Sequence, residues 1–258
     1  MKLPIEWLPA AGMPEQLIVL LHGWGSRAVS MQPLAQALRE DFPQAAILAP
    51  DAPHPVDGGG RGRQWYSIVE LDDATWQRRV QATLPQLQRW VRAQQHRLHV
   101  GPAATALGGF SQGAILSMAL AMHDDGIAGR VLAFGGCLVG APHAAPQHTT
   151  LHLFHGSEDT VIPAERSRTA IEQLGALQGD ATIDIAEGVG HLLHPVLIEC
   201  ARHRLRSHIP ARTWRAALGA AATAPVRTEP VEVPQQAAGA SFDKVRTIGN
   251  AGSAQAED

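Results

Sequence analysis

A serine, a carboxylate and a histidine follow one another along this chain, each in a short segment that contains glycine. Ser111 is the centre of Gly-Phe-Ser-Gln-Gly (109–113), Asp159 ends His-Gly-Ser-Glu-Asp (155–159), and His191 ends Glu-Gly-Val-Gly-His (187–191). A serine hydroxyl is a poor nucleophile at neutral pH unless a base takes its proton and a carboxylate orients that base. We therefore predict Ser111 as nucleophile, His191 as general base and acid, and Asp159 as the orienting carboxylate.

The residues around Ser111 form a G-x-S-x-G pattern between a short apolar run and a helix that is apolar on nearly every face. Such a turn from strand to helix projects the serine above a sheet, at a helix N-terminus whose dipole favours an oxyanion. The plain alternative is an ordinary Gly-Ser turn, but the flanking strand and helix patterns argue against it. Glu158 is the second candidate for the acid, and Asp184 is disfavoured because it lies within a predicted strand.

Acyl transfer also requires hydrogen-bond donors directed at the developing oxyanion. The backbone N–H of Gln112, directly after the nucleophile, is one predicted donor. The second is the N–H of Trp24 in His-Gly-Trp-Gly (22–25), which follows the apolar run 16–21. We also expect Trp24, Trp65, Tyr66 and Leu192 to line the substrate pocket.

The elements that must position these residues alternate between strand and helix patterns. Strands are predicted at 16–21, 45–49, 104–108, 130–134, 151–154 and 181–186, and helices at 31–40 (capped by Ser30), 73–95 (bent or divided at Pro85), 112–123, 164–177 and 194–208. This alternation requires crossover connections and a mainly parallel sheet with helices on both faces. Ligands of such sheets bind at the carboxyl ends of the strands, where His22, Ser111 and His155 are expected to lie.

Composition excludes several classes of protein. With 258 residues, a net charge of −3 and a pI near 6.5, the chain has no basic excess, so a nucleic-acid partner is not expected. The N-terminus lacks the apolar core of a signal peptide, and no apolar run is long enough to span a membrane. Cys137 and Cys200 lie in apolar runs typical of buried thiols, so we predict a cytoplasmic protein. No metal-binding motif occurs, and no cofactor is expected.

The composition changes after Pro210. Residues 217–224 are almost all Ala, Gly and Thr, and 225–258 are rich in Pro, Ala, Gly, Thr and Glu with few large apolar residues. We predict one catalytic domain over 1–210 and a disordered tail over 211–258.

Together these segments resemble the phospholipase/carboxylesterase family of α/β-hydrolases, which includes the acyl-protein thioesterases. The resemblance covers about 16–210 and rests on Leu-Leu-His-Gly-Trp-Gly (20–25), Gly-Arg-Gln-Trp-Tyr-Ser (62–67), the Phe-Ser-Gln-Gly turn, His-Gly-Ser-Glu-Asp and Gly-His (190–191). It implies an α/β-hydrolase fold with a sheet of about seven strands and no large lid. It also implies a serine esterase for short acyl esters or thioesters. We expect a monomer or homodimer.

Two further readings of the function stay open. The family often has Leu where Trp24 stands, and Trp24 would narrow the pocket for long acyl chains. An acyl-protein thioesterase or lysophospholipase-like deacylase would nevertheless use the same three residues. A catalytically silent α/β-hydrolase that binds a ligand is the alternative from another class, but such proteins typically lack one of the three residues.

Overall fold

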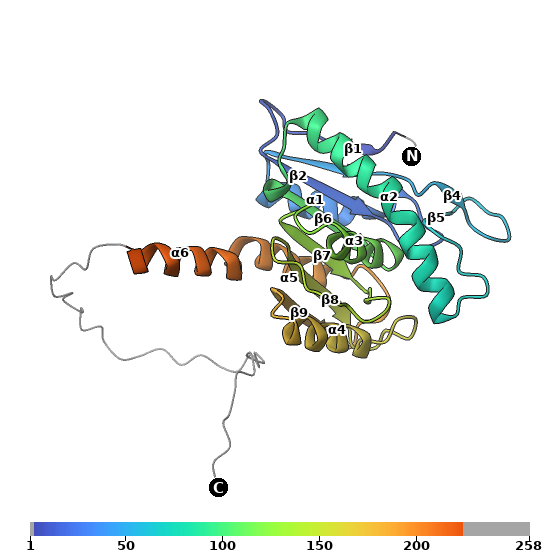
Figure 1. Cartoon of the computed structure of the whole chain (residues 1–258). Helices are drawn as coiled ribbons and strands as arrows, with labels where there is room; N and C mark the ends of the chain where they lie inside the picture. The colour runs from blue at the N-terminus through green and yellow to red at the C-terminus, as the bar shows by residue number, and fades with distance from the viewer. Residues whose placement is uncertain (1–2, 224–258) are drawn as a thin grey trace, which may run out of the picture.

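The computed structural model describes residues 3–223, and its centre is a seven-stranded sheet in the order β1-β3-β2-β6-β7-β8-β9 (Figure 1). The strands are β1 (Ile5–Trp7), β2 (Gln16–Leu21), β3 (Ala45–Ala49), β6 (Thr105–Phe110), β7 (Arg130–Phe134), β8 (Thr150–Gly156) and β9 (Ala181–Ala186). Only β1 runs antiparallel to its neighbour, and every other pair in the sheet is parallel. A separate two-stranded hairpin joins β4 (His54–Pro55) to β5 (Arg63–Gln64).

Helices cover both faces of the sheet, as the sequence predicts. The longer helices are α1 (Gln32–Asp41), α2 (Asp73–Leu98), α3 (Gln112–His123), α4 (Glu165–Ala176), α5 (Pro195–Ser207) and α6 (Ala211–Thr223), and two short 3₁₀ turns are η1 (Ala28–Met31) and η2 (Pro102–Ala104). The apolar sides of α2, α3 and α4 pack on one face, and those of α1 and α5 pack on the other. Successive residues of β2 alternate between these two cores: Leu17, Val19 and Leu21 face one, Ile18 and Leu20 the other.

The predicted elements differ from the observed ones in several places, among them the strands β4 and β5, which were not expected. The three-residue edge strand β1 was not expected. Ser30 lies inside η1, where its hydroxyl donates to the carbonyl of Arg27, so it does not cap α1. Pro85 does not divide α2, because Val80, Leu84, Leu87 and Val91 hold the helix against the core on both sides of it. The first residues of the predicted tail form α6, which begins beside the sheet and projects away from it (Figure 1); residues 224–258 lie outside the described residues.

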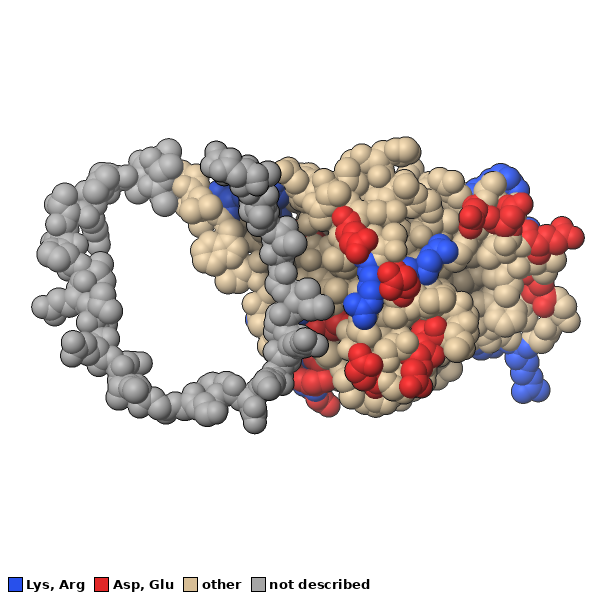
Figure 2. Space-filling view, turned by 90° about the horizontal axis from the view of Figure 1, so that it is seen from below, with Lys and Arg blue, Asp and Glu red and all other residues tan. Residues whose placement is uncertain are grey.

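Charged side chains of both signs lie side by side on the face shown in Figure 2, without a broad field of either sign. Among residues 3–223, several charged side chains form ion pairs, such as Arg202 with Asp41 and Arg204 with Asp184. Within residues 3–223, no helix is both long and apolar enough to cross a bilayer.

Candidate active site

Ser111 occupies the turn between β6 and α3 in a backbone conformation that is rare for a residue with a side chain. Its φ is +54° and its ψ is −115°, and its N–H donates to the carbonyl of Phe134 at 2.9 Å. A Cβ on Gly109 would lie 2.3 Å from the backbone of Gly113, and one on Gly113 would lie 2.0 Å from the carbonyl oxygen of Leu21. The two glycines are therefore needed for the strand and helix to meet this closely, and the strain is stored at the serine.

The structure brings the three residues predicted for catalysis into one hydrogen-bonded chain. Nε2 of His191 lies 3.0 Å from Oγ of Ser111, and Nδ1 lies 2.6 Å from Oδ2 of Asp159. His191 also packs against the ring of Phe110, with 4.8 Å between ring centroids. Each residue lies in the loop that directly follows a strand, β6, β8 or β9, so the parallel sheet places all three at one edge.

The carboxylate of Asp159 is almost fully buried, and both of its oxygens are occupied. Oδ1 accepts the backbone N–H groups of Val161 and Ile162, each at 2.9 Å. Oδ2 faces Nδ1 of His191, and Nε2 of His155 lies 3.2 Å from it. The two backbone donors fix the rotation of the carboxylate, so that Oδ2 stays directed at His191.

His155, at the end of β8, is a second imidazole at this carboxylate, and the sequence did not assign it a role. Its Nε2 lies 2.7 Å from the carbonyl of Ile162 and its Nδ1 lies 2.8 Å from the hydroxyl of Ser167. Since a carbonyl can only accept, the proton belongs on Nε2. Burial lowers the pKa of His155 and keeps the ring neutral. Its signal in the sequence is its place directly after the predicted strand 151–154 and before Gly156.

The loop that carries Trp24 is held by hydrogen bonds of buried side chains. His22 is fully buried, donates from Nδ1 to the carbonyl of Gly23 at 2.7 Å, and accepts the N–H of Ala52 at Nε2 at 3.0 Å. Trp65 donates its indole N–H to the carbonyl of His22 at 2.8 Å. The side-chain amide of Gln112 accepts the N–H of Trp65 and donates to the carbonyl of Tyr66. These bonds fix the loop after β2 relative to the first turn of α3.

A cavity of about 870 Å³ opens beside Ser111, and most of its lining is apolar. Three of the four residues predicted to line a pocket do so, namely Trp24, Tyr66 and Leu192. Trp65 does not line it, because its ring is buried and its N–H is directed inward to His22. The prediction for Trp65 is therefore corrected. The remaining apolar lining comes from residues that the sequence did not single out: Met31, Ile68, Leu71, Trp76, Phe110, Ile115, Val161, Ile162 and Leu193.

The other carboxylates near this edge are engaged differently. Glu158 is exposed, and no hydrogen bond joins it to His191 in the described part of the chain. Asp184 lies in β9 and forms two hydrogen bonds of 2.9 Å with the guanidinium of Arg204. Among residues 3–223, no three His, Cys, Asp or Glu side chains are grouped as a metal site would require. The arrangement has the parts of an acyl-transfer site: a strained serine, a hydrogen-bonded imidazole and a buried carboxylate.

The chain is similar to known esterases and thioesterases. The family model described as phospholipase/carboxylesterase matches residues 8–209. The chain is 37% identical to Esterase YpfH of Escherichia coli over 204 residues, which is 79% of this chain and 88% of that protein. It is 24% identical to acyl-protein thioesterase 1 of Gibberella zeae over 223 residues, covering 79% of this chain and 95% of that one.

Solved structures show the same architecture. The crystal structure of esterase PE8 superimposes with a TM-score of 0.74 at 29% identity, covering 81% of this chain and all of the other. The Bacillus cereus carboxylesterase, at 15% identity and a TM-score of 0.67, shares the fold. With a family match that spans most of its length and an esterase relative above 30% identity, the chain belongs to the phospholipase/carboxylesterase family of α/β-hydrolases.

Proposed function

We propose that this protein is a serine carboxylesterase that hydrolyses short acyl esters through Ser111, His191 and Asp159. The family assignment makes the chain a carboxylic-ester hydrolase. The observation that carries the residue roles is the pair of contacts at His191, 3.0 Å to the Ser111 hydroxyl and 2.6 Å to the Asp159 carboxylate. That geometry suits an imidazole that takes a proton at Nε2 while Nδ1–H is held by a carboxylate.

In the proposed reaction, Oγ of Ser111 attacks the ester carbonyl carbon while Nε2 of His191 takes the hydroxyl proton. The tetrahedral oxyanion is stabilised by the N–H of Gln112, which has no partner within α3 because it is the first residue of that helix, and by the N–H of Trp24. His191 then gives its proton to the departing alcohol, leaving an acyl ester on Ser111. Water, deprotonated by His191, attacks this ester, and the proton returns to Oγ as the acid leaves.

The decisive test compares wild type with Ser111→Ala on p-nitrophenyl acetate and butyrate. We expect kcat/KM to fall by about 10³-fold or more, because the covalent route is lost. Ser207→Ala, which changes an exposed serine of α5, should retain the wild-type rate and serves as the matched control. Equal rates for Ser111→Ala and wild type would refute the nucleophile, and a wild type that turns over neither ester would favour the non-catalytic binding role.

A second candidate function, deacylation of longer acyl groups, is favoured by the size of the cavity. A water molecule, with one non-hydrogen atom, takes about 30 Å³ in the liquid. A butyryl group has only five non-hydrogen atoms, so it fills a small part of the 870 Å³ beside Ser111. Trp24 lines this cavity but is 44% exposed, and its indole N–H donates to Oε1 of Gln64 at 2.9 Å.

A series of p-nitrophenyl esters from acetate to decanoate separates the two candidates. Each additional methylene that is buried in the transition state contributes about 0.8 kcal/mol, or about fourfold in kcat/KM. A maximum at two to four carbons supports the short-chain esterase. A rise that continues to eight carbons or beyond supports the deacylase.

We further propose the cytoplasm as the site of action, as the sequence suggests. Cys137 and Cys200 are both free thiols, and burial raises the pKa of Cys137 to about 11. Unpaired, unreactive cysteines are typical of proteins that work in a reducing compartment.

A further inference from the structure

A second cavity lies at the amino ends of the strands, on the opposite edge of the sheet from Ser111. Its volume is about 370 Å³, within the range of small-molecule sites. It is bounded by the first residues of β2 and β6, by Phe42 after α1, by Leu205 of α5 and by the start of α6. Because Arg130 and Arg212 both line it, we call it the arginine cavity.

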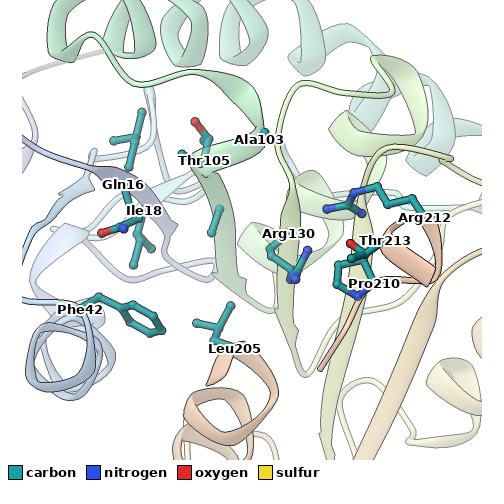
Figure 3. A pocket seen from close by; sticks show the side chains of 13 residues that line it. Gln16, Ile18, Phe42, Ala103, Thr105, Arg130, Leu205, Pro210, Arg212 and Thr213 are labelled. Atoms are coloured by element: carbon teal, nitrogen blue, oxygen red, sulfur yellow. The ribbon is translucent and has the colours of Figure 1, made fainter. Parts of the chain in front are cut away.

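The two arginines reach this cavity from different elements. Arg130 is the first residue of β7 and is partly buried, and Arg212 is the second residue of α6. Figure 3 shows Arg130 in the middle, with Phe42 and Leu205 on one side of it and Arg212 on the other. The family match ends at residue 209, so the α6 wall of this cavity lies outside the region that the chain shares with its family.

In the part of the chain that the structure describes, neither guanidinium forms an ion pair with a carboxylate. Arg130 donates to the carbonyl of Gly129, and Arg212 donates to the same carbonyl and to the hydroxyl of Thr150, at 3.1 to 3.3 Å. Asp180 is near enough to favour the charge of Arg130. Its oxygens, however, already accept hydrogen bonds from Thr150, His208 and the N–H of Ala211.

Two guanidinium groups that line one cavity repel each other. Burial and the neighbouring Arg212 both lower the pKa of Arg130, whereas the charge of Asp180 raises it. An anion between them would offset that repulsion, and a planar guanidinium suits a carboxylate or phosphate through two parallel hydrogen bonds.

We propose that the arginine cavity binds a small organic anion, whose carboxylate or phosphate lies between Arg130 and Arg212 and whose apolar part packs against Phe42 and Leu205. The hydroxyl-bearing Thr213 also lines the cavity and adds a polar residue on the α6 side. The arginine cavity and the cavity beside Ser111 have no lining residue in common.

The test is calorimetric titration of the full chain with benzoate and with phenyl phosphate, using uncharged benzamide as the matched probe. Arg212→Gln removes one charge at the partly buried start of α6, and Arg212→Lys keeps the charge but not the planar guanidinium. Arg215→Gln, on the same helix but bonded to Gln147, is the control. The melting temperature of each variant shows whether the fold is retained, and titration in increasing NaCl reports the electrostatic share of binding.

We expect at least one of the two anions to bind wild type and Arg215→Gln equally. Arg212→Gln should weaken that binding by about tenfold or more, the size of a lost charge-assisted hydrogen bond, and Arg212→Lys by less. Comparison of benzoate with phenyl phosphate then identifies the preferred head group. Benzamide binding as tightly as benzoate would overturn the proposal. So would anion binding that Arg212→Gln leaves unchanged, as expected if the probe occupied the cavity beside Ser111, or no binding of either anion to wild type.

Discussion

Replacing Asp159 with Asn tests how the buried carboxylate controls His191. The N–H groups of Val161 and Ile162 both donate to Oδ1, so the asparagine oxygen must take that position. Its NH₂ group then stands where Oδ2 was, 2.6 Å from Nδ1 of His191. Since an amide nitrogen only donates, Nδ1 must accept, and the proton of the neutral imidazole moves to Nε2. That proton faces Ser111, so Nε2 can no longer accept the serine proton.

The opposite amide orientation does not rescue the enzyme. It would set the NH₂ group against the two backbone donors and lose two buried hydrogen bonds, each costing about 1–3 kcal/mol. The wrong tautomer therefore dominates, and kcat should fall by about 10⁴-fold, the loss known for the same substitution in a serine protease triad. This corresponds to about 5.5 kcal/mol in the activation free energy.

The assay is steady-state hydrolysis of p-nitrophenyl butyrate at neutral pH, with circular dichroism to show that the variant is folded. Glu158→Gln changes the neighbouring exposed carboxylate and should keep nearly full activity. An Asp159→Asn rate within about tenfold of wild type, or an equal loss in Glu158→Gln, would refute this account of the acid.

Three further predictions concern Gly113, His152 and His155. Gly113→Ala places a Cβ 2.0 Å from the carbonyl oxygen of Leu21 and should lower the melting temperature sharply. Gly175→Ala, whose added Cβ meets no atom within 4 Å, should leave the melting temperature unchanged or raise it. Equal melting temperatures in the two variants would contradict the packing argument. Burial lowers the pKa of His152 to about 3 in the folded protein, so as the pH falls the unfolded chain takes up a proton at this residue before the folded protein does. The free energy of unfolding should therefore fall by up to about 1.4 kcal/mol per pH unit as the pH drops from about 6.5 toward 3. Urea titrations across this pH range should show a smaller loss of unfolding free energy in His152→Leu than in wild type. Equal losses in the two proteins would exclude this contribution of His152. His155→Leu removes a donor to the Ile162 carbonyl and should lower kcat more than it changes KM, with partial recovery in His155→Gln; an unchanged kcat would remove His155 from the positioning of Asp159.

Much of the fold could be predicted because several of its strands are buried and mostly apolar. The runs that became β2, β6 and β8 are buried on both faces of a parallel sheet, and such strands need no alternation to be recognised. Once the strands are placed, the carboxyl-end rule brings Ser111, Asp159 and His191 to one edge without any knowledge of side-chain geometry.

What the sequence could not supply depended on the direction of individual side chains. Trp65 lies in a loop of aromatic residues, and only the carbonyl of His22 beneath it decides that its indole turns inward. The position of His155 depends on its contact with the carbonyl of Ile162, seven residues further along the chain. β1 has only three residues, too few for a strand pattern to be recognised. The meeting of Arg130 with Arg212 joins residues far apart in the chain, and no local pattern reports that.

Some residues around Ser111 hold the loops in place and others only line the cavity, and this difference determines where the enzyme can be redesigned. His22, Trp65 and Gln112 hold neighbouring loops through hydrogen bonds, so combinatorial libraries at these positions would mostly yield misassembled proteins. Ile68, Val161 and Leu192 form part of the cavity wall and are at least 40% exposed. Because their side chains are not packed within the core, randomising them can change which esters are accepted while the reacting groups keep their alignment.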